Sequence, residues 1–112
     1  MKYGVLMLLL VAGLAGTLAS AARKESSYAA SAPALFAKNC SSCHGKDGRA
    51  KTLKGKLKHA RNLNDPEWQD RVSDERIFNS IMNGKGKMPA YGKKLSEQEI
   101  DSLVGYVRSL KK

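Results

Sequence analysis

The sequence predicts a small all-α protein with about four to five short helices. The clearest evidence lies near the C-terminus, where Ile100, Leu103 and Val107 follow the i, i+3, i+7 spacing of a helix with one apolar face. No segment alternates apolar and polar residues over the length that a half-buried strand needs. The chain of 112 residues has room for one domain and contains no internal repeat.

The first 22 residues are typical of an export signal. Lys2 supplies a positive start, the run from Val5 to Leu14 is apolar, and Ala19-Ser20-Ala21 matches a signal-peptidase site. The alternative is a retained membrane anchor, because residues 3–22 just reach the roughly 20 apolar or small residues that span a bilayer. We favour cleavage because the strongly apolar part is short. The chain is expected to be periplasmic or otherwise exported, soluble if the signal is cleaved and membrane-anchored if it is not.

A polar stretch separates the expected signal peptide, residues 1–22, from the expected domain, residues 31–112. Residues 23–30 have no apolar period and are predicted to be a linker. Ser31 can cap a helix that has Pro33 in its first turn, where proline is tolerated. This first helix continues at helical spacing through Leu35, Phe36, Asn39, Cys40 and Cys43.

The middle of the domain is expected to contain a basic loop and then two short helices. Residues 45–61 contain three glycines and seven Lys or Arg residues, so we expect a loop with at most a brief helical turn. Asp65-Pro66 suits the cap and first turn of a helix that carries Trp68. Ser73 can cap the next helix, for which Asn83-Gly84 is a typical stop signal.

The last helix has the strongest start signal in the chain. Ser96-Glu97-Gln98-Glu99 forms a full capping box, in which the first and last of these residues cap each other's backbone groups. Lys111 and Lys112 suit the negative end of the helix dipole. We therefore expect a helix from this box almost to the C-terminus.

Cys40, Cys43 and His44 form the Cys-x-x-Cys-His pattern of covalent haem attachment. Two thiols at this spacing can add to two vinyl groups at one edge of the porphyrin, and the next residue then reaches the iron as its proximal ligand. A thioredoxin-like redox pair would need a βαβ context. A zinc site would need a fourth ligand, and His59 has no plausible spacing for that role. The sequence therefore predicts one covalently bound haem c.

The sixth ligand of the iron decides between electron transfer and ligand chemistry. The candidates are Met82, Met88, His59 and several lysines. Met82 fits the core on a predicted helix, whereas His59 lies in a basic stretch that suits a solvent-exposed histidine. Met88 lies in a glycine-rich loop stiffened by Pro89, which can present a side chain at a fixed angle, so Met88 is the predicted ligand. With His44 and Met88 both on the iron, the chain is predicted to be an electron carrier and not an enzyme.

The net charge of the chain indicates which classes of partner it can bind. After residues 1–22 the chain has 19 Lys and Arg residues against 10 Asp and Glu residues, a formal net charge of +9. Such a charge favours acidic protein partners or anionic lipid surfaces. Nucleic acid is not an expected partner, because the chain lacks interleaved aromatic residues and any reader motif. The alternative function is a haem-based sensor or a peroxidase-like enzyme with a labile sixth ligand.

Several segments resemble small monohaem class I cytochromes c of bacteria, including the cytochrome modules of some oxidases. They are the helix into Cys40-Ser41-Ser42-Cys43-His44-Gly45, the Met88-Pro89-Ala90-Tyr91 loop, the final amphipathic helix, and the stretch from Asn62 to Trp68 followed by Ser73-Asp74-Glu75. The resemblance covers about residues 31–110. It implies the class I cytochrome c fold wrapped around one haem, His/Met ligation and transfer of single electrons between redox proteins.

The resemblance also implies specific contacts. The first and last helices should cross, with Ala32 and Phe36 packed against Leu103 and Tyr106. Trp68 lies in a region that often approaches the haem propionates in this family, although burial as a core aromatic explains it equally well.

Basic residues lie on both sides of the expected haem site. In the family fold the stretches beside Met88 and after His44 adjoin the haem, and their basic residues are Lys85, Lys87, Lys93, Lys94, Lys46, Arg49 and Lys51. A positive ring of this kind implies redox partners with acidic docking surfaces. We expect the chain to act as a monomer.

Overall fold

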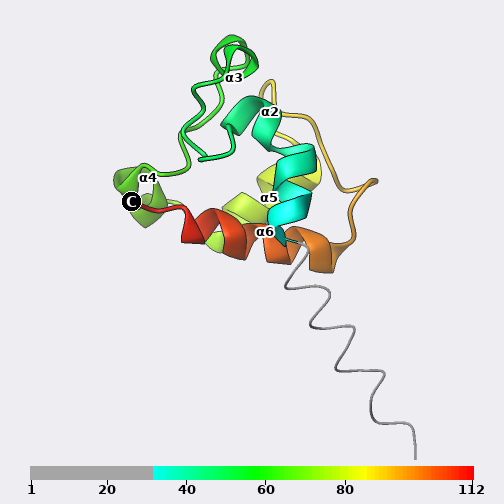
Figure 1. Ribbon diagram of the computed structural model, residues 1–112. Helices are drawn as coiled ribbons and strands as arrows, with labels where there is room; N and C mark the ends of the chain where they lie inside the picture. Colours follow the sequence, from blue (N-terminus) through cyan, green and yellow to red (C-terminus); the bar gives the residue numbers. More distant parts are fainter. Residues whose placement is uncertain (1–31) are drawn as a thin grey trace, which may run out of the picture.

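The computed structural model describes residues 32–112, and within that range the chain is helical and contains no β-strand (Figure 1). Residues 32–39 form the first helix, and a turn at Cys40 separates it from α2. The labelled helices are α2 (Ser41–His44), α3 (Leu53–Leu57), α4 (Pro66–Arg71), α5 (Asp74–Asn83) and α6 (Glu97–Ser109). The all-α prediction is confirmed, and the brief helical turn expected within residues 45–61 is α3.

Three helices begin at the residues that the sequence predicts. The side chain of Asp65 caps α4 and that of Ser73 caps α5, each by accepting a backbone N–H of the first turn. At α6 the capping box between Ser96 and Glu99 is complete in both directions. These bonds satisfy N–H groups that a helix start leaves without partners inside the helix. The predicted cap of the first helix, Ser31, lies outside the described residues.

The core forms where the first helix crosses α6. Phe36 is 2% exposed, and its ring centroid lies 4.9 Å from that of Tyr106 with the two planes tilted by 48°. Ala32 and Leu103 are also buried, and Leu103 belongs to the same apolar cluster as Phe36. Tilted aromatic pairs at this distance add to the stabilisation that burial supplies. The crossing that the family resemblance implies is therefore confirmed.

A buried polar network ties α4 to α6. Gln69 is buried and donates from Nε2 to the backbone oxygen of Val107, at 2.8 Å. Arg108 donates to the backbone oxygens of Gln69 and Val72, each at 2.6 Å, and to the carboxylate of Asp74, also at 2.6 Å. Because buried polar groups without partners are costly, this network fixes α4, and with it the backbone at Trp68, relative to α6.

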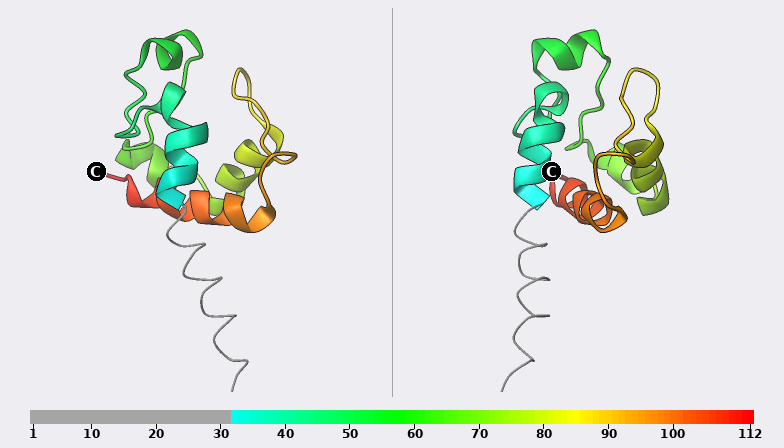
Figure 2. Two further views of the ribbon diagram at one scale, coloured as in Figure 1. Left: turned by 45° about the vertical axis from the view of Figure 1, so that its right-hand side comes forward. Right: turned by 90° about the vertical axis from the view of Figure 1, so that its right-hand side faces the viewer.

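Helix α3 lies at the end of the molecule opposite α6 (Figure 2). In both views of Figure 2 the loop between α5 and α6 rises at that same end. Contacts join α3 to α2, and α5 packs along α6. None of the helices within residues 32–112 is long and apolar enough to span a bilayer.

Candidate haem-binding site

The two predicted attachment cysteines lie at the junction between the first helix and α2. Cys40 occupies the turn and Cys43 lies on α2, and both are partly buried free thiols. Burial and, to a lesser extent, the neighbouring Cys43 raise the pKa of Cys40 to about 11. Neither thiol forms a disulfide, so both sulfurs are available for thioether bonds.

His44 is the last residue of α2 and follows Cys43 directly. Its Nδ1 lies 2.9 Å from the backbone oxygen of Arg61. Because a carbonyl oxygen only accepts hydrogen bonds, Nδ1 carries the proton and Nε2 keeps a free lone pair. Burial lowers the pKa of His44, although the hydrogen bond with Arg61 acts in the opposite direction. The ring is thus held as the neutral tautomer that a haem iron binds.

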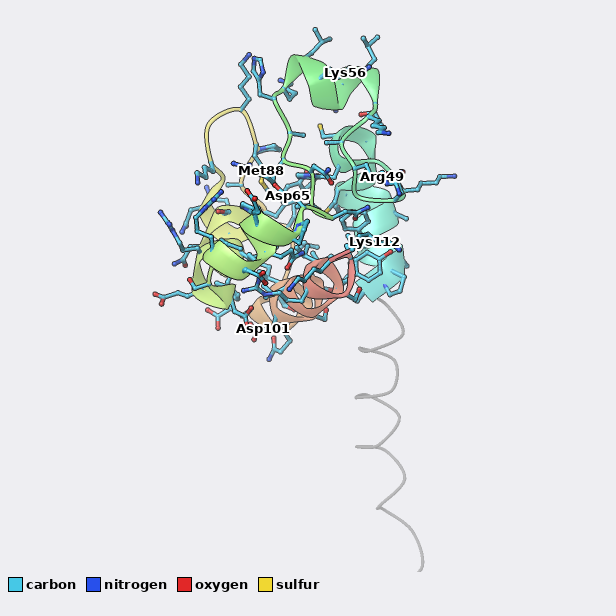
Figure 3. All side chains as sticks on the ribbon, turned by 90° about the vertical axis from the view of Figure 1, so that its left-hand side faces the viewer. Arg49, Lys56, Asp65, Met88, Asp101 and Lys112 are labelled. Carbon is cyan, nitrogen blue, oxygen red and sulfur yellow. The ribbon has the colours of Figure 1, made fainter. Side chains whose placement is uncertain are left out.

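Met88 lies in a tight turn within the loop that joins α5 to α6. Lys85 and Met88 exchange two backbone hydrogen bonds, at 3.1 and 2.9 Å, around Gly86, whose φ is 57°. A Cβ atom at Gly84 would lie only 2.7 Å from the Met88 backbone oxygen, so this turn needs glycine at its start. The Met88 side chain is partly buried and packs against the core. Figure 3 shows Met88 between the end of the molecule that carries Lys56 and the end that carries Asp101.

The other candidates for the sixth ligand lie elsewhere. Met82 is partly buried on α5 and packs against the core, and a Cβ atom at Gly92 would overlap its sulfur. His59 is exposed in the basic stretch, with a left-handed φ of 54°. These positions agree with a core role for Met82 and a surface role for His59.

The Tyr91 hydroxyl connects the Met88 loop to the attachment helix. It donates to the backbone oxygen of Asn39 at 2.8 Å, across 52 positions of the chain. Asn39 is the last residue of the first helix, directly before the turn at Cys40. Burial, with smaller contributions from the Cys40 and Cys43 thiols, raises the pKa of Tyr91.

The role of Tyr91 was missed in the sequence. Only the Met-Pro-Ala-Tyr pattern pointed to this residue, and the pattern says nothing of a partner for its hydroxyl. The bond to Asn39 nevertheless joins the two segments that carry the candidate iron ligands, His44 and Met88.

Trp68 lies on α4, partly buried against the core. The Arg61 guanidinium lies over its ring, 6.0 Å from the ring centroid. This packing agrees with the interpretation of Trp68 as a core aromatic, and a contact between Trp68 and a haem propionate stays a prediction.

The described residues fit a covalently attached haem. Two thiols and a neutral imidazole come from one short stretch of chain, and a thioether sulfur comes from a loop tied to that stretch by Tyr91. Thioether attachment through cysteine with axial imidazole and methionine sulfur is the ligation that cytochromes c use.

Comparisons with known proteins find cytochromes c among the proteins that this chain resembles. The family model described as "Cytochrome C oxidase, cbb3-type, subunit III" matches residues 28–107. The cbb3-type cytochrome c oxidase subunit FixP of Azorhizobium caulinodans is 35% identical over 101 residues, which are 89% of this chain and 33% of FixP. Cytochrome c6 of Aphanizomenon flos-aquae is 36% identical over 81 residues, 69% of this chain and 84% of that protein. Cytochrome c6 of Gracilaria tenuistipitata var. liui is 35% identical over 77 residues.

The chain therefore spans a third of FixP and 64% of the Gracilaria protein. A solved structure of the c-type cytochrome KustC0563 is 39% identical and superposes with a TM-score of 0.67, covering 72% of this chain and 98% of that one. This likeness confirms the predicted class I cytochrome c fold.

Proposed function

The chain belongs to the family of c-type cytochrome domains and carries covalently bound haem c, and from that premise we propose that it transfers single electrons between redox proteins. The observation that supports this most directly is the Tyr91–Asn39 hydrogen bond, which joins the Met88 loop to the helix that precedes His44. A site with both axial ligands supplied by the protein suits a carrier, because no position on the iron is left for a substrate.

The roles of the site residues form part of the proposal. Cys40 and Cys43 hold the haem as thioethers, and His44 and Met88 are the axial ligands of the iron. When bound, haem supplies a one-electron couple between ferrous and ferric iron. The protein's part is to hold these ligands in place: the carbonyl of Arg61 fixes the His44 ring, and Tyr91 keeps the loop closed. The family resemblance supports one further proposed role, in which the Trp68 indole N–H on α4 donates to a haem propionate.

The second candidate function, a haem-based sensor or peroxidase-like enzyme, requires a sixth ligand that leaves easily. A potentiometric titration with CO addition separates the two. For the carrier we expect a reversible one-electron wave and a visible spectrum that CO does not change in the reduced protein. Rapid CO binding to the reduced wild-type protein would instead favour the sensor or enzyme.

Charge on the described chain is segregated, which supports a partner with an acidic docking surface. Basic residues gather in the 45–61 stretch around α3 and in the loop that carries Met88. Acidic residues gather on α4, on α5 and at the start of α6: Asp65, Glu67, Asp70, Asp74, Glu75, Glu97, Glu99 and Asp101. Figure 3 shows Lys56 and Asp101 at opposite ends of the molecule. An encounter with an acidic protein would therefore select the end that carries α3.

If the basic end is preferred, removing two positive charges there should change the oxidation rate more than removing two positive charges elsewhere. The pair Lys85→Gln and Lys93→Gln should slow oxidation by the anionic reagent ferricyanide roughly two- to fivefold at about 10 mM ionic strength, because the reagent is attracted to the basic end. The control pair Arg71→Gln and Arg76→Gln removes the same charge from α4 and α5 and should have little effect. Stopped-flow rates measure both, and the difference should disappear at high salt. Equal slowing by the two pairs would show that only net charge matters.

Placement in the cell is also proposed. Residues 1–22, which lie outside the described residues, direct export to the periplasm or its equivalent, residues 23–30 link them to the domain of residues 31–112, and the mature chain is a monomer. The apolar run from Val5 to Leu14 and the small residues after it support the signal. Intact mass of the protein from soluble and membrane fractions tests this, because a retained segment would add the mass of 22 residues.

A further inference from the structure

Helix α3 exposes two leucines on the face that points away from the haem-attachment segment. Leu53 is 76% exposed and Leu57 is 65% exposed, and no other large apolar side chain within residues 32–112 is exposed in this way. Gly55, between them, is buried, and a Cβ atom there would overlap the backbone oxygen of Cys43. Each leucine is two residues from Gly55, which is more than half a turn of helix, so both leucines lie on the opposite face. Two adjacent leucines with so little cover indicate a partner outside the described chain.

All the charged residues around the two leucines are basic. Residues 48–64 contain no Asp or Glu. Their six basic residues are all exposed: Arg49, Lys51, Lys54, Lys56, Lys58 and Arg61. Within residues 32–112, the lysines at positions 54, 56 and 58 form no ion pair. The leucines are thus an apolar centre with a cationic rim, which favours an anionic partner and opposes pairing with the same face of a second copy.

The position of α3 in the fold favours a lipid surface over a protein. Figure 1 shows α3 at the end of the described chain that lies away from α6, and Figure 3 shows Lys56 at that end. A standard protein interface buries about 800 Å² on each partner, over about 20–30 residues. Helix α3 has five residues, and the helix that it contacts is α2. A fluid bilayer needs no matching surface, so a small projecting tip is sufficient to bind it.

We propose that the α3 tip, residues 53–58, is a membrane-docking element that binds the surface of an anionic lipid bilayer. Leu53 and Leu57 enter the boundary between headgroups and acyl chains, and the lysines between and after them stay among the anionic headgroups. Lysine suits this position because its apolar stem can lie in the boundary while its ammonium group stays in water. Two leucines and a few charges give reversible binding, far weaker than that of a spanning helix.

This inference goes beyond the electron transfer proposed above and does not depend on which residues ligate the iron. The bilayer supplies the apolar cover that the leucines lack in the described chain, and it gives the basic 45–61 stretch a role. A carrier held on the surface meets membrane-embedded redox partners by diffusion in two dimensions.

Vesicle binding tests the two leucines. Haem-loaded protein from the soluble fraction is sedimented with vesicles of phosphatidylcholine, either alone or with about one third phosphatidylglycerol, at about 10 mM ionic strength. Haem absorption of the pellet measures the bound fraction, and the wild type should bind only the anionic vesicles. Leu53→Ser with Leu57→Ser should lower the partition coefficient about tenfold or more, because the apolar surface is lost. Leu53→Met with Leu57→Met keeps that surface and should stay within about twofold of wild type.

A second pair of variants tests the charges. Lys54→Gln with Lys56→Gln should lower binding to the anionic vesicles about tenfold at low ionic strength, and much less at high salt. Arg71→Gln with Arg76→Gln removes the same charge from α4 and α5 and should lower binding less than about threefold. Visible spectra should match the wild type throughout, because no substitution changes a residue that is proposed to hold the haem. A single Leu57→Ser variant carries the leucine comparison if the serine pair accumulates poorly.

Three results would overturn the inference: no binding of the wild type to anionic vesicles, equal binding to neutral and anionic vesicles, or wild-type binding by the serine pair. In the first case, slower electron transfer from the serine pair to an acidic redox protein would assign the α3 tip to a protein interface. Failure of the proposed function has a different signature. Wild-type protein without a haem spectrum would reject that function, whereas a normal spectrum without vesicle binding rejects only the membrane docking.

Discussion

Replacing Met88 with alanine is expected to open the haem iron, so that the reduced protein binds CO readily and its reduction potential falls. Axial methionine raises the potential of cytochromes c, and axial ligands together cover a span of about 0.8 V. We expect a decrease on the order of 0.1–0.3 V within that span. Visible absorption with and without CO, together with potentiometric titration, measures both effects. Stability should change little by comparison, because Met88 lies in a loop and is only partly buried.

Met82→Ala is the matched control, because it removes the other methionine between α4 and α6. The Met82 side chain extends from α5 against Gly92, so its loss should lower the free energy of unfolding by about 2 kcal/mol and leave CO binding absent. Wild-type spectra for Met88→Ala, combined with CO binding by Met82→Ala, would transfer the ligand assignment to Met82. The pair of variants therefore decides between the two sulfurs directly.

Phe36→Ala is expected to produce the largest loss of stability of any single substitution in the first helix. Phe36 is almost fully buried and packs against the tilted ring of Tyr106, so truncation should cost about 3–5 kcal/mol. Domains of this size have a free energy of unfolding of about 5–15 kcal/mol, and each kcal/mol moves Tm by roughly 4–8 °C. We therefore expect a decrease in Tm of at least about 12 °C. Thermal unfolding followed by circular dichroism measures it.

The control for this prediction keeps a large apolar side chain at position 36 but removes the aromatic ring. Phe36→Leu fills most of the same space and should cost about 1–1.5 kcal/mol. If alanine and leucine at this position gave the same Tm, the crossing of the first helix with α6 would contribute less to stability than its packing indicates. Haem attachment should survive in both variants, because neither changes Cys40, Cys43 or His44.

Helix starts were predictable because they depend on local chemistry. The carboxylate of Asp65 and the hydroxyls of Ser73 and Ser96 cap backbone groups within three residues, so the sequence alone carries the signal. The attachment motif is local for the same reason. The family resemblance added one long-range contact, the crossing at Phe36, which periodicity could not supply.

What could not be predicted depends on partners that lie far apart in the chain. The Tyr91 hydroxyl donates to the backbone oxygen of Asn39, 52 positions away, and neither residue type signals this partner. Gln69 has a polar side chain that sequence reasoning places at the surface, and it is buried because Arg108 and backbone oxygens satisfy it. The contact between Gly55 and the carbonyl of Cys43 likewise has no signal in residue type beyond the glycine itself.

The crossing of the first helix with the last also bears on the order of events during synthesis. Phe36 and Tyr106 are about 70 residues apart, so the helix that presents the thiols meets its main packing partner only when nearly the whole chain exists. Contacts of such wide separation form late, because a long loop must close first. Until then the first helix, which precedes Cys40 and Cys43, lacks the packing partner that it has in the folded chain. The architecture thereby leaves an interval in which maturation can precede closure of the fold.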